Sequence, residues 1–384
     1  MPIKWSDAVK IATDFRHELH AEPELTWQEV ETSKKIRAML DHYNIKWKSF
    51  AKTGTVGYLG KNIKGKHIAL RADIDALDVQ ETTGLKYASV KKNHMHACGH
   101  DGHTATLMAV AIFLSENETK LSNQVSLVFQ PAEEGGHGAK KMIEEGCLDG
   151  VDFIYGWHNW PAIKFGQALC PDGAVMAGNG TFTISLEGEG GHSSQPEMCK
   201  DPVLAGSAIV VALQQIVSRQ IGPQDAAVVS VTSFEAPSGL TAIPSFAKLA
   251  GSIRVTSSEM KEVIADSIKN IAKNTAAAYG VNAIVEFKNR YNATINHKEE
   301  AENYREILKN NLGENWQSQV KTPIMASEDF SYYLEKIPGA FALIGSDDGE
   351  EKHCKPCHNA SYDFNDKLID VAGKILMECA GYRF

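Results

Sequence analysis

The sequence predicts an α/β protein, in which a mixed, largely parallel sheet with helices on both faces is joined by an inserted α+β domain. Short apolar runs alternate with helical patterns through the first half of the chain, as in parallel sheets that are covered on both sides. Polar, ligand-type residues follow those runs, where such sheets place their sites. At 384 residues the chain exceeds one ordinary hydrophobic core, which favours two domains.

Two helices are predicted at the amino end, followed by alternating strands and helices. Ser6 can cap the first helix, which runs toward His20 and stops before Pro23. Thr26 and Glu29 have the spacing of a capping box for the second helix. Strands are then predicted at residues 56–59, 68–72, 125–129 and 153–157, with helices at 104–115 and 139–145.

The pattern changes near Gly178, where residues 181–186 alternate as a half-exposed strand does. A helix from Pro202, strands at 227–234 and 246–254, a helix at 257–279 and a strand at 282–288 follow. This β-α-β-β-α-β order predicts a ferredoxin-like domain. We place it at residues 178–291, inserted into a larger domain made of residues 1–177 and 292–384.

The composition is that of a soluble globular protein, with 43% hydrophobic and 23% charged residues. The net charge of −9, without any Lys/Arg block, argues against a nucleic-acid partner. Residues 1–20 do not resemble a signal peptide, and the stretch that we take as the longest apolar one, 105–114, is too short to span a bilayer. Seven cysteines without disulfide-framework spacing suit a reducing compartment. We therefore expect a cytoplasmic protein without a membrane partner.

Four histidines, a thiol and a carboxylate fall within residues 94–103. So many ligand-type side chains in one segment indicate a functional site, because each of them needs a polar partner when buried. Cys98 and His100 stand two residues apart, and Gly99 between them lets both face one point. A thiolate favours Zn²⁺ or another late divalent ion, and carboxylates also admit Mn²⁺. A buried cysteine alone would more often be structural, but the cluster favours a metal site.

Two pairs of carboxylates follow predicted strands. Asp73 and Asp75 project to one face because they are two residues apart, and an acid there could orient a ligand histidine or a general base. Glu133 and Glu134 would repel each other unless a cation separates their roles. A metal hydrolase needs one carboxylate on the metal and one on the attacking water. Exposed acids in turns are the alternative interpretation.

Further histidines lie beside predicted strands or in loops. His158 follows the strand at 153–157, and His358 lies in a segment that also holds Cys354 and Cys357. The spacing of those cysteines leaves open a redox motif or a separate zinc site. His192 lies in a glycine-rich turn, 188–196, that lacks a phosphate-binding pattern. Its imidazole could stabilise an oxyanion, or the turn could be a plain surface turn.

Several segments resemble the amidohydrolase branch of the M20 metallopeptidase family: hippurate hydrolases, N-acyl-amino-acid deacylases and plant auxin-conjugate hydrolases. They are residues 16–25, 71–77, 96–103, 130–134, 156–159, 188–196 and 327–330, and MHACGHDGH is specific to that branch. The resemblance implies two divalent metal ions per chain, drawn from Zn, Mn, Co and Ni. It makes Cys98 the bridging ligand and Glu133 the catalytic acid/base. The further ligands that it implies are His100, Glu134, His158 and His358.

The resemblance also assigns roles outside the ligand set. Asp75 falls where an aspartate orients a ligand or the base. His192 matches the histidine of the family's lid or dimerisation domain, which makes the inserted domain a candidate homodimer contact. Asp78 stands where a proline is usual, and Thr241 stands about where an asparagine is common. Both departures bear on substrate specificity rather than on the chemistry.

We expect a metal-dependent amidohydrolase that releases a free amino acid from a small-molecule N-acyl amino acid, with acetyl as the favoured acyl group. Glu133 would take a proton from the attacking water and pass it to the leaving amine. Arg254, at the end of a strand of the inserted domain, is a candidate partner for the substrate carboxylate. The alternatives are a dipeptidase or aminopeptidase on the same scaffold, or a non-catalytic metal or redox sensor using Cys98, Cys354 and Cys357.

Overall fold

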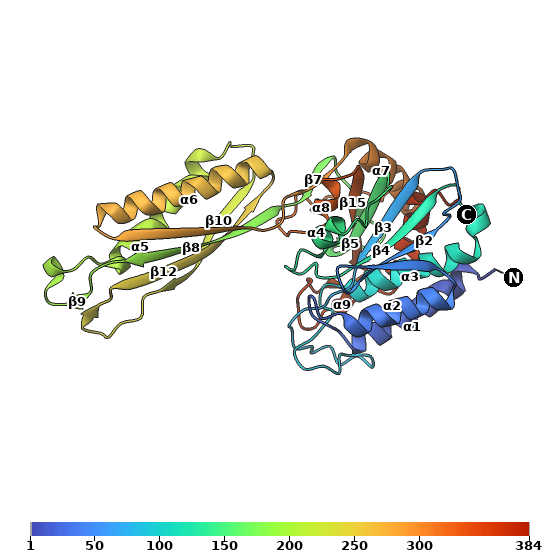
Figure 1. Ribbon diagram of the computed structural model, residues 1–384, viewed down its shortest axis with the longest axis horizontal. Coiled ribbons are helices and arrows are strands. Elements are labelled where there is room, and N and C mark those ends of the chain that lie inside the picture. Colours follow the sequence, from blue (N-terminus) through green and yellow to red (C-terminus); the bar gives the residue numbers. More distant parts are fainter. Residues whose placement is uncertain (1, 384) are drawn as a thin grey trace. The chain divides into compact units, whose positions relative to one another are not determined.

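The computed structural model describes residues 2–383, and the chain divides into two compact units (Figure 1). The first runs through Val175 and continues at Ile295–Thr322 and from Asp329 onward. The second comprises Met176–Thr294 and Pro323–Glu328. The short second segment was not expected there. It joins this unit because the Ala177 amide donates to the Ile324 carbonyl at 2.8 Å, and Arg254 Nε donates to the Met325 carbonyl at 3.0 Å.

A seven-stranded sheet forms the centre of the first unit, in the order β1-β2-β4-β3-β5-β15-β6. The four strands β4, β3, β5 and β15 pair in parallel, while β1, β2 and β6 pair antiparallel at the two sides. The predicted mixed, largely parallel sheet is therefore confirmed. The strands are β1 (Lys46–Phe50), β2 (Gly54–Leu59), β3 (His67–Asp73), β4 (Gln124–Gln130), β5 (Phe153–Lys164), β6 (Ala168–Leu169) and β15 (Gly339–Asp347).

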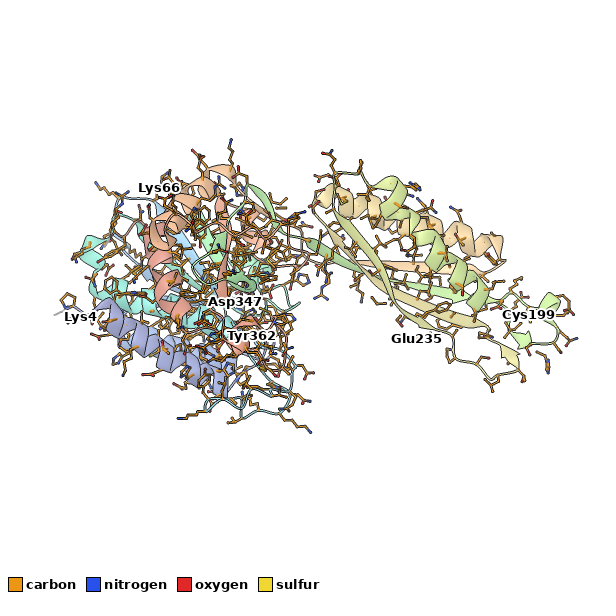
Figure 2. All side chains as sticks on the ribbon, turned by 180° about the vertical axis from the view of Figure 1, so that it is seen from behind. Lys4, Lys66, Cys199, Glu235, Asp347 and Tyr362 are labelled. Atoms are coloured by element: carbon orange, nitrogen blue, oxygen red, sulfur yellow. The ribbon has the colours of Figure 1, made fainter. Side chains whose placement is uncertain are left out.

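Helix α3 is the central helix of this unit. It is buried from His100 through Leu114, and beyond its polar first turn it is apolar on all sides, as a fully buried helix requires. It packs on β3 and α10, and against α1 and α2, which lie beside it in Figure 1. Aromatic residues of the carboxyl-terminal segment, including Tyr362 (labelled in Figure 2), complete the core. The helices are α1 (Trp5–Ala21), α2 (Val30–His42), α3 (His100–Glu116), α4 (Gly138–Glu144), α7 (Lys298–Leu312), α8 (Ser331–Leu334), α9 (Glu351–Cys354) and α10 (Lys367–Cys379), with the 3-10 turn η1 (Glu118–Lys120).

Both predicted helix caps are wrong. Helix α1 begins at Trp5, one residue before Ser6, and has no side-chain cap. Glu29 does occupy the N-cap position of α2, but its carboxylate does not cap that helix. Thr26 Oγ1 instead donates to Asp75 Oδ2 at 2.8 Å, and Glu29 accepts from the amide of Ala132 at 2.9 Å. Partners far along the chain therefore outcompete the local capping arrangement.

The second unit contains an antiparallel sheet in the order β10-β12-β8-β13, with α5 and α6 packed against it. Its main elements are β8 (Gly178–Glu187), α5 (Pro202–Leu213), β10 (Ala227–Glu235), β12 (Phe246–Val255), α6 (Ser258–Ala278) and β13 (Asn282–Asn289). Smaller elements are β9 (Gly191–His192), η2 (Pro196–Met198), η3 (Ile216–Gln220) and β11 (Ala242–Ile243), while β7 (Gly173–Met176) and β14 (Thr294–Asn296) lie where the chain passes between the units. The lid or dimerisation role of residues 178–291 stays a prediction.

One stretch of the second unit, Pro202–Gln220, is long and apolar enough to cross a membrane by length and composition alone. The apolar stretch at residues 105–114 is therefore not the longest in the chain. In the structure Pro202–Gln220 is α5 followed by η3, and one face, including Ala205, Ile209 and Leu213, is buried in the core of this unit. Only 33% of this stretch is buried, and apolar side chains of the opposite face, such as Leu204 and Val211, are exposed.

Candidate metal centre

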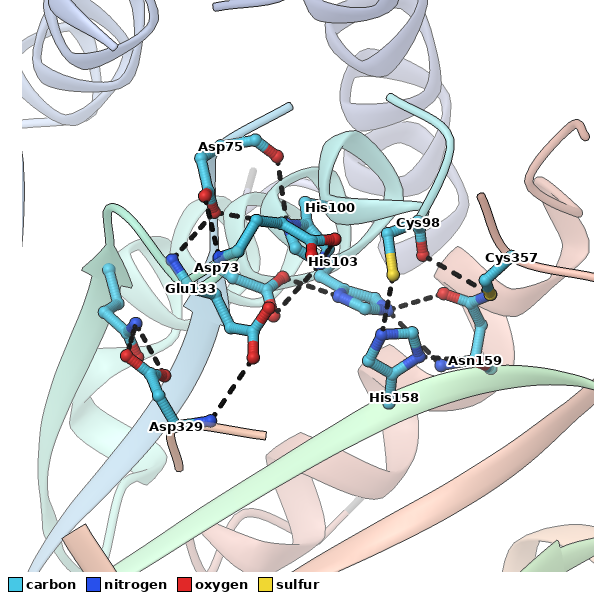
Figure 3. Close-up of polar contacts among 12 residues, drawn as sticks. Asp73, Asp75, Cys98, His100, His103, Glu133, His158, Asn159, Asp329 and Cys357 are labelled. Atoms are coloured by element: carbon cyan, nitrogen blue, oxygen red, sulfur yellow. Dashed lines mark hydrogen bonds and ion pairs between the residues drawn. The ribbon is translucent and has the colours of Figure 1, made fainter. Parts of the chain in front are cut away.

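The predicted ligands of the first unit come together beside the carboxyl ends of β3 and β4. Figure 3 shows three of them, Cys98, His100 and His158. Two groups of three ligand atoms, each group within 4.8 Å, share the thiol of Cys98. We call them the first triad, Cys98, His100 and His158, and the second triad, Cys98, Glu134 and His358. Residues far apart in the sequence therefore converge on one sulfur atom.

Gly99 lets Cys98 and His100 face the same point. Its φ of +89° is in the left-handed region, and it forms the N-cap of α3, whose first residue is His100. A Cβ atom at this position would lie 2.6 Å from Asn159 Oδ1 and 2.7 Å from the hydroxyl of Tyr362. Both the backbone conformation and the space require glycine here.

The ring nitrogens of the first-triad histidines are fixed by hydrogen bonds. His100 Nδ1 donates to the carbonyl of Asp75 at 2.9 Å, which turns Nε2 toward the cluster. His158 Nδ1 donates to the carbonyl of Asn159 at 2.6 Å, and its Nε2 lies 3.3 Å from Cys98 Sγ. Metal-binding histidines are usually oriented in this way, with one nitrogen on a carbonyl or carboxylate and the other on the ion.

Two buried atoms at the centre of the cluster have no hydrogen-bond partner within residues 2–383: His100 Nε2 and Glu134 Oε1. They lie 4.0 Å apart, and Glu134 Oε1 is also 3.3 Å from His358 Nε2. Buried polar atoms without partners are costly unless something binds them. Thiolate, imidazole and carboxylate together form a donor set suited to zinc and other late divalent ions. The cluster therefore fits metal binding.

The protonation states of this cluster reflect its negative charge. Burial by itself lowers the pKa of His100, but the carboxylates of Asp73 and Asp75 raise it to about 10. Burial holds the pKa of His158 well below its usual range, which keeps that imidazole neutral, the form that binds metal. The neighbouring Cys357 thiol and burial raise the pKa of Cys98. A cation at the shared sulfur would oppose that rise, because a coordinating thiol is deprotonated.

Asp75 positions the loop that carries both glutamates. Its Oδ1 accepts from the Glu133 amide at 3.1 Å, and its Oδ2 accepts from the Glu134 amide at 3.0 Å. Burial by itself raises the pKa of Asp75, but the hydrogen bonds from His100 and from the Glu134 amide lower it below its usual value, so the carboxylate is charged. The Glu133 side chain is buried and accepts from the Asp329 amide at 3.3 Å. One aspartate thus connects His100 with the glutamate pair.

The sequence matches a known family over most of its length. Residues 69–380 match the model of peptidase family M20/M25/M40. The chain belongs to this family. It is 39% identical to the hippurate hydrolase of Campylobacter jejuni, over 95% of this chain and 94% of that protein. It is 36% identical to an N-acetyl-L-cysteine deacetylase of Bacillus subtilis, over 99% of this chain and 89% of that protein.

A solved structure agrees with this assignment. A dinuclear metal-binding peptidase of the M20 family from Bacillus subtilis matches with a TM-score of 0.83 and 32% identity, over 98% of each chain. The predicted resemblance is therefore confirmed at the family level, and this M20 protein is a hydrolase. The roles of individual residues in its site remain predictions.

In this M20 hydrolase, Glu29 contacts the loop that carries Glu133, and the sequence did not predict this contact. Its buried carboxylate accepts from the amides of Trp27 and Ala132 at 3.0 and 2.9 Å, and from Thr53 Oγ1 at 2.9 Å. Ala132, directly before Glu133, has a φ of +57°, a conformation that costs a non-glycine residue energy. Burial and the Asp75 carboxylate raise the pKa of Glu29 to about 7. Glu29 therefore stabilises the strained backbone turn that positions the Glu133 side chain.

Two buried arginines of the M20 hydrolase surround the cluster with ion pairs. Arg71 binds Asp73 at 2.7 Å and Asp329 at 3.1 Å, which connects β3 to the residue whose amide contacts Glu133. Arg16 binds Asp101 at 2.9 Å and also Asp363 and Asp366. It ties α1 to the first turn of α3 and to the carboxyl-terminal segment. Both arginines lie in the segments that carry the family resemblance, but spacing alone does not indicate these partners.

Two predicted site residues lie in the second unit. His192 is exposed in β9, where it pairs with Ala242 of β11. Arg254 lies in β12 and donates from Nε to the Met325 carbonyl and from a terminal nitrogen to the carbonyl of Ile253. Their contact with the oxyanion and with the substrate carboxylate stays a prediction.

Proposed function

We propose that this M20 hydrolase cleaves the amide bond of N-acyl amino acids, with N-acetyl amino acids as the favoured substrates, to give a carboxylate and a free amino acid. The two triads that share Cys98, beside a buried Glu133, support the proposal most directly. The names of two relatives, a hippurate hydrolase and an N-acetyl-L-cysteine deacetylase, support the substrate class. A cytoplasmic location and a homodimer stay predictions.

The chain binds two divalent metal ions, and we assign one to each triad. His100 and His158 would hold one ion, Glu134 and His358 would hold the other, and Cys98 would contribute to both. The mixed donor set admits Zn²⁺, Mn²⁺, Co²⁺ or Ni²⁺. Such ions, when bound, polarise an amide carbonyl and lower the pKa of water.

Glu133 is the general base and acid in this proposal. Its carboxylate takes a proton from the attacking water and delivers it to the nitrogen of the leaving amine. The Asp329 amide and the two amides on Asp75 keep Glu133 and Glu134 in separate positions. One glutamate can then serve as ligand while its neighbour moves the proton.

His192 is the proposed donor to the oxyanion. Its Nδ1 accepts from the amide of Ser194 at 3.1 Å and from the Ser194 hydroxyl at 2.7 Å. In the neutral imidazole the proton therefore resides on Nε2, which is the tautomer that can donate to an oxyanion. Arg254 is the proposed contact of the substrate carboxylate, and residues 178–291 form the proposed lid or dimerisation domain.

A substrate panel with defined metals tests the function. We expect the protein loaded with Zn²⁺, Mn²⁺, Co²⁺ or Ni²⁺ to hydrolyse N-acetyl amino acids and benzoylglycine, with little activity on dipeptides. Release of free amino acid is the measurement, and metal-stripped protein is the control. Faster turnover of dipeptides would instead support a dipeptidase, and metal binding without hydrolysis of any panel member would support a sensor.

Glu29→Ala is expected to lower turnover by displacing Glu133, the proposed general base. The substitution leaves the amide of Ala132 without its acceptor, which costs about 1–3 kcal/mol of unfolding free energy. A shift of Glu133 by about 1 Å lowers kcat by up to about 10²-fold. Glu29→Gln is the matched control, because its amide oxygen can still accept from Ala132 and it should retain most activity. Urea unfolding and separate kcat and KM values check this, and a normal kcat in folded Glu29→Ala would contradict it.

A further inference from the structure

Cys357 lies beside the sulfur atom shared by the two triads. The amide of His358 donates to the carbonyl of Ala97 at 2.7 Å, which brings the two cysteine-bearing segments together. Cys357 Sγ lies 3.9 Å from the Cys98 carbonyl oxygen (Figure 3). The Cys357 thiol, together with burial, raises the pKa of Cys98. The proposed hydrolysis has no use for this second thiol.

The other cysteine of the CxxC pair is directed elsewhere. Cys354 is exposed, and its thiol donates to Asp347 Oδ1 at 2.8 Å and contacts the carbonyl of Glu350 at 3.2 Å (Asp347 is labelled in Figure 2). Cys357 is contacted by Asn159 Nδ2 at 3.8 Å, and Asn159 is itself held by Tyr362 and His103. The geometry therefore pairs Cys357 with Cys98 rather than with Cys354.

We propose that Cys98 and Cys357 form a reversible disulfide when a peroxide oxidises the metal-free chain, and that this disulfide withdraws the shared sulfur from the metal centre. Cys357 is partly exposed whereas Cys98 is buried, so the peroxide reaches Cys357 first. The effect on metal binding rests on the proposed function, because it requires Cys98 to be a ligand in both triads. Formation of the disulfide does not depend on any catalytic activity.

The two steps balance with hydrogen peroxide as the oxidant. The Cys357 sulfur attacks one peroxide oxygen, the O–O bond breaks, and a sulfenic acid and one water form. The Cys98 sulfur then attacks the Cys357 sulfur, the S–O bond breaks, and the disulfide and a second water form. The two thiols lose two electrons and two protons in total, and a thiol reductant reverses the change by exchange.

Peptide mapping of the full-length chain tests the proposal. The chain is stripped with a chelator, exposed to hydrogen peroxide, blocked with a thiol-alkylating reagent and digested for mass spectrometry. We expect a peptide pair cross-linked through Cys98 and Cys357 that dithiothreitol removes, and much less of it when Zn²⁺ is bound first. The oxidised, metal-free chain should take up less Zn²⁺ than the reduced chain, and dithiothreitol should restore the uptake.

Two variants sharpen this experiment. Cys354→Ser should leave the cross-link intact, whereas Cys357→Ser should abolish it. A cross-link between Cys354 and Cys357, or Cys98 left as a free thiol after Cys357 has been oxidised, would overturn the proposal. Because the first mapping uses the unaltered chain, its result does not depend on how the variants fold. An inactive substrate panel would leave the mapping unaffected, so failure of the proposed function and failure of the disulfide are distinguishable.

Discussion

Glu133→Gln is expected to lower turnover by about 10²–10⁴-fold without loss of bound metal. Glutamine has nearly the same size, and its amide oxygen can still accept from the Asp329 amide, now 3.3 Å from Glu133 Oε1. It cannot take a proton from water or return one to the leaving amine. The loss should therefore appear in kcat, with KM little changed.

The neighbouring glutamate provides the matched control. Glu134→Gln makes the same chemical change one residue later, at a side chain that belongs to the second triad. We expect it to reduce metal content as well as turnover. Metal analysis together with steady-state kinetics on both variants separates a proton carrier from a ligand. A Glu133→Gln protein within a few-fold of the parent would assign the proton transfer to another group.

The alternation of apolar runs and helical patterns predicted most of the first unit, because buried parallel strands have few polar residues. Strand ends were less predictable. His158 was expected just after a strand, but β5 continues to Lys164. The strand extends because β15 pairs with it in parallel beyond His158, and β15 comes from residues 339–347, far along the chain. The residues around His158 cannot predict pairing with a strand so distant in the sequence.

Glu29 shows the same limit within the site. Its spacing from Thr26 is that of a capping box, and nothing nearby in the sequence contradicts that interpretation. The partner that matters for the site, the Ala132 amide, is 103 residues away. The proposed ligands were easier to recognise than Glu29, Asp329 or Arg71, because clustered histidines and paired glutamates are unusual in a core. A buried residue that only positions another side chain carries no such compositional signal.

The two triads are expected to divide the bound metal between them. His158 belongs to the first triad alone and His358 to the second alone, whereas Cys98 belongs to both. His158→Ala and His358→Ala should therefore each lose about one of two ions, while Cys98→Ser should weaken both. We expect turnover to fall by about 10³-fold or more in each variant, since a catalytic metal contributes several kcal/mol to transition-state stabilisation.

Metal content after dialysis against buffered Zn²⁺ checks the expected losses of metal in the three variants, and thermal unfolding of the same samples checks that each variant is folded. His94→Ala is the control, because His94 lies in the same histidine-rich segment but in neither triad, and its Nδ1 bonds to the Lys92 carbonyl. That variant should keep both ions. If Cys98→Ser lost only one ion while His158→Ala and His358→Ala behaved as expected, the sulfur would belong to a single metal. Unchanged metal content in both Cys98→Ser and His158→Ala would remove the basis for the first triad.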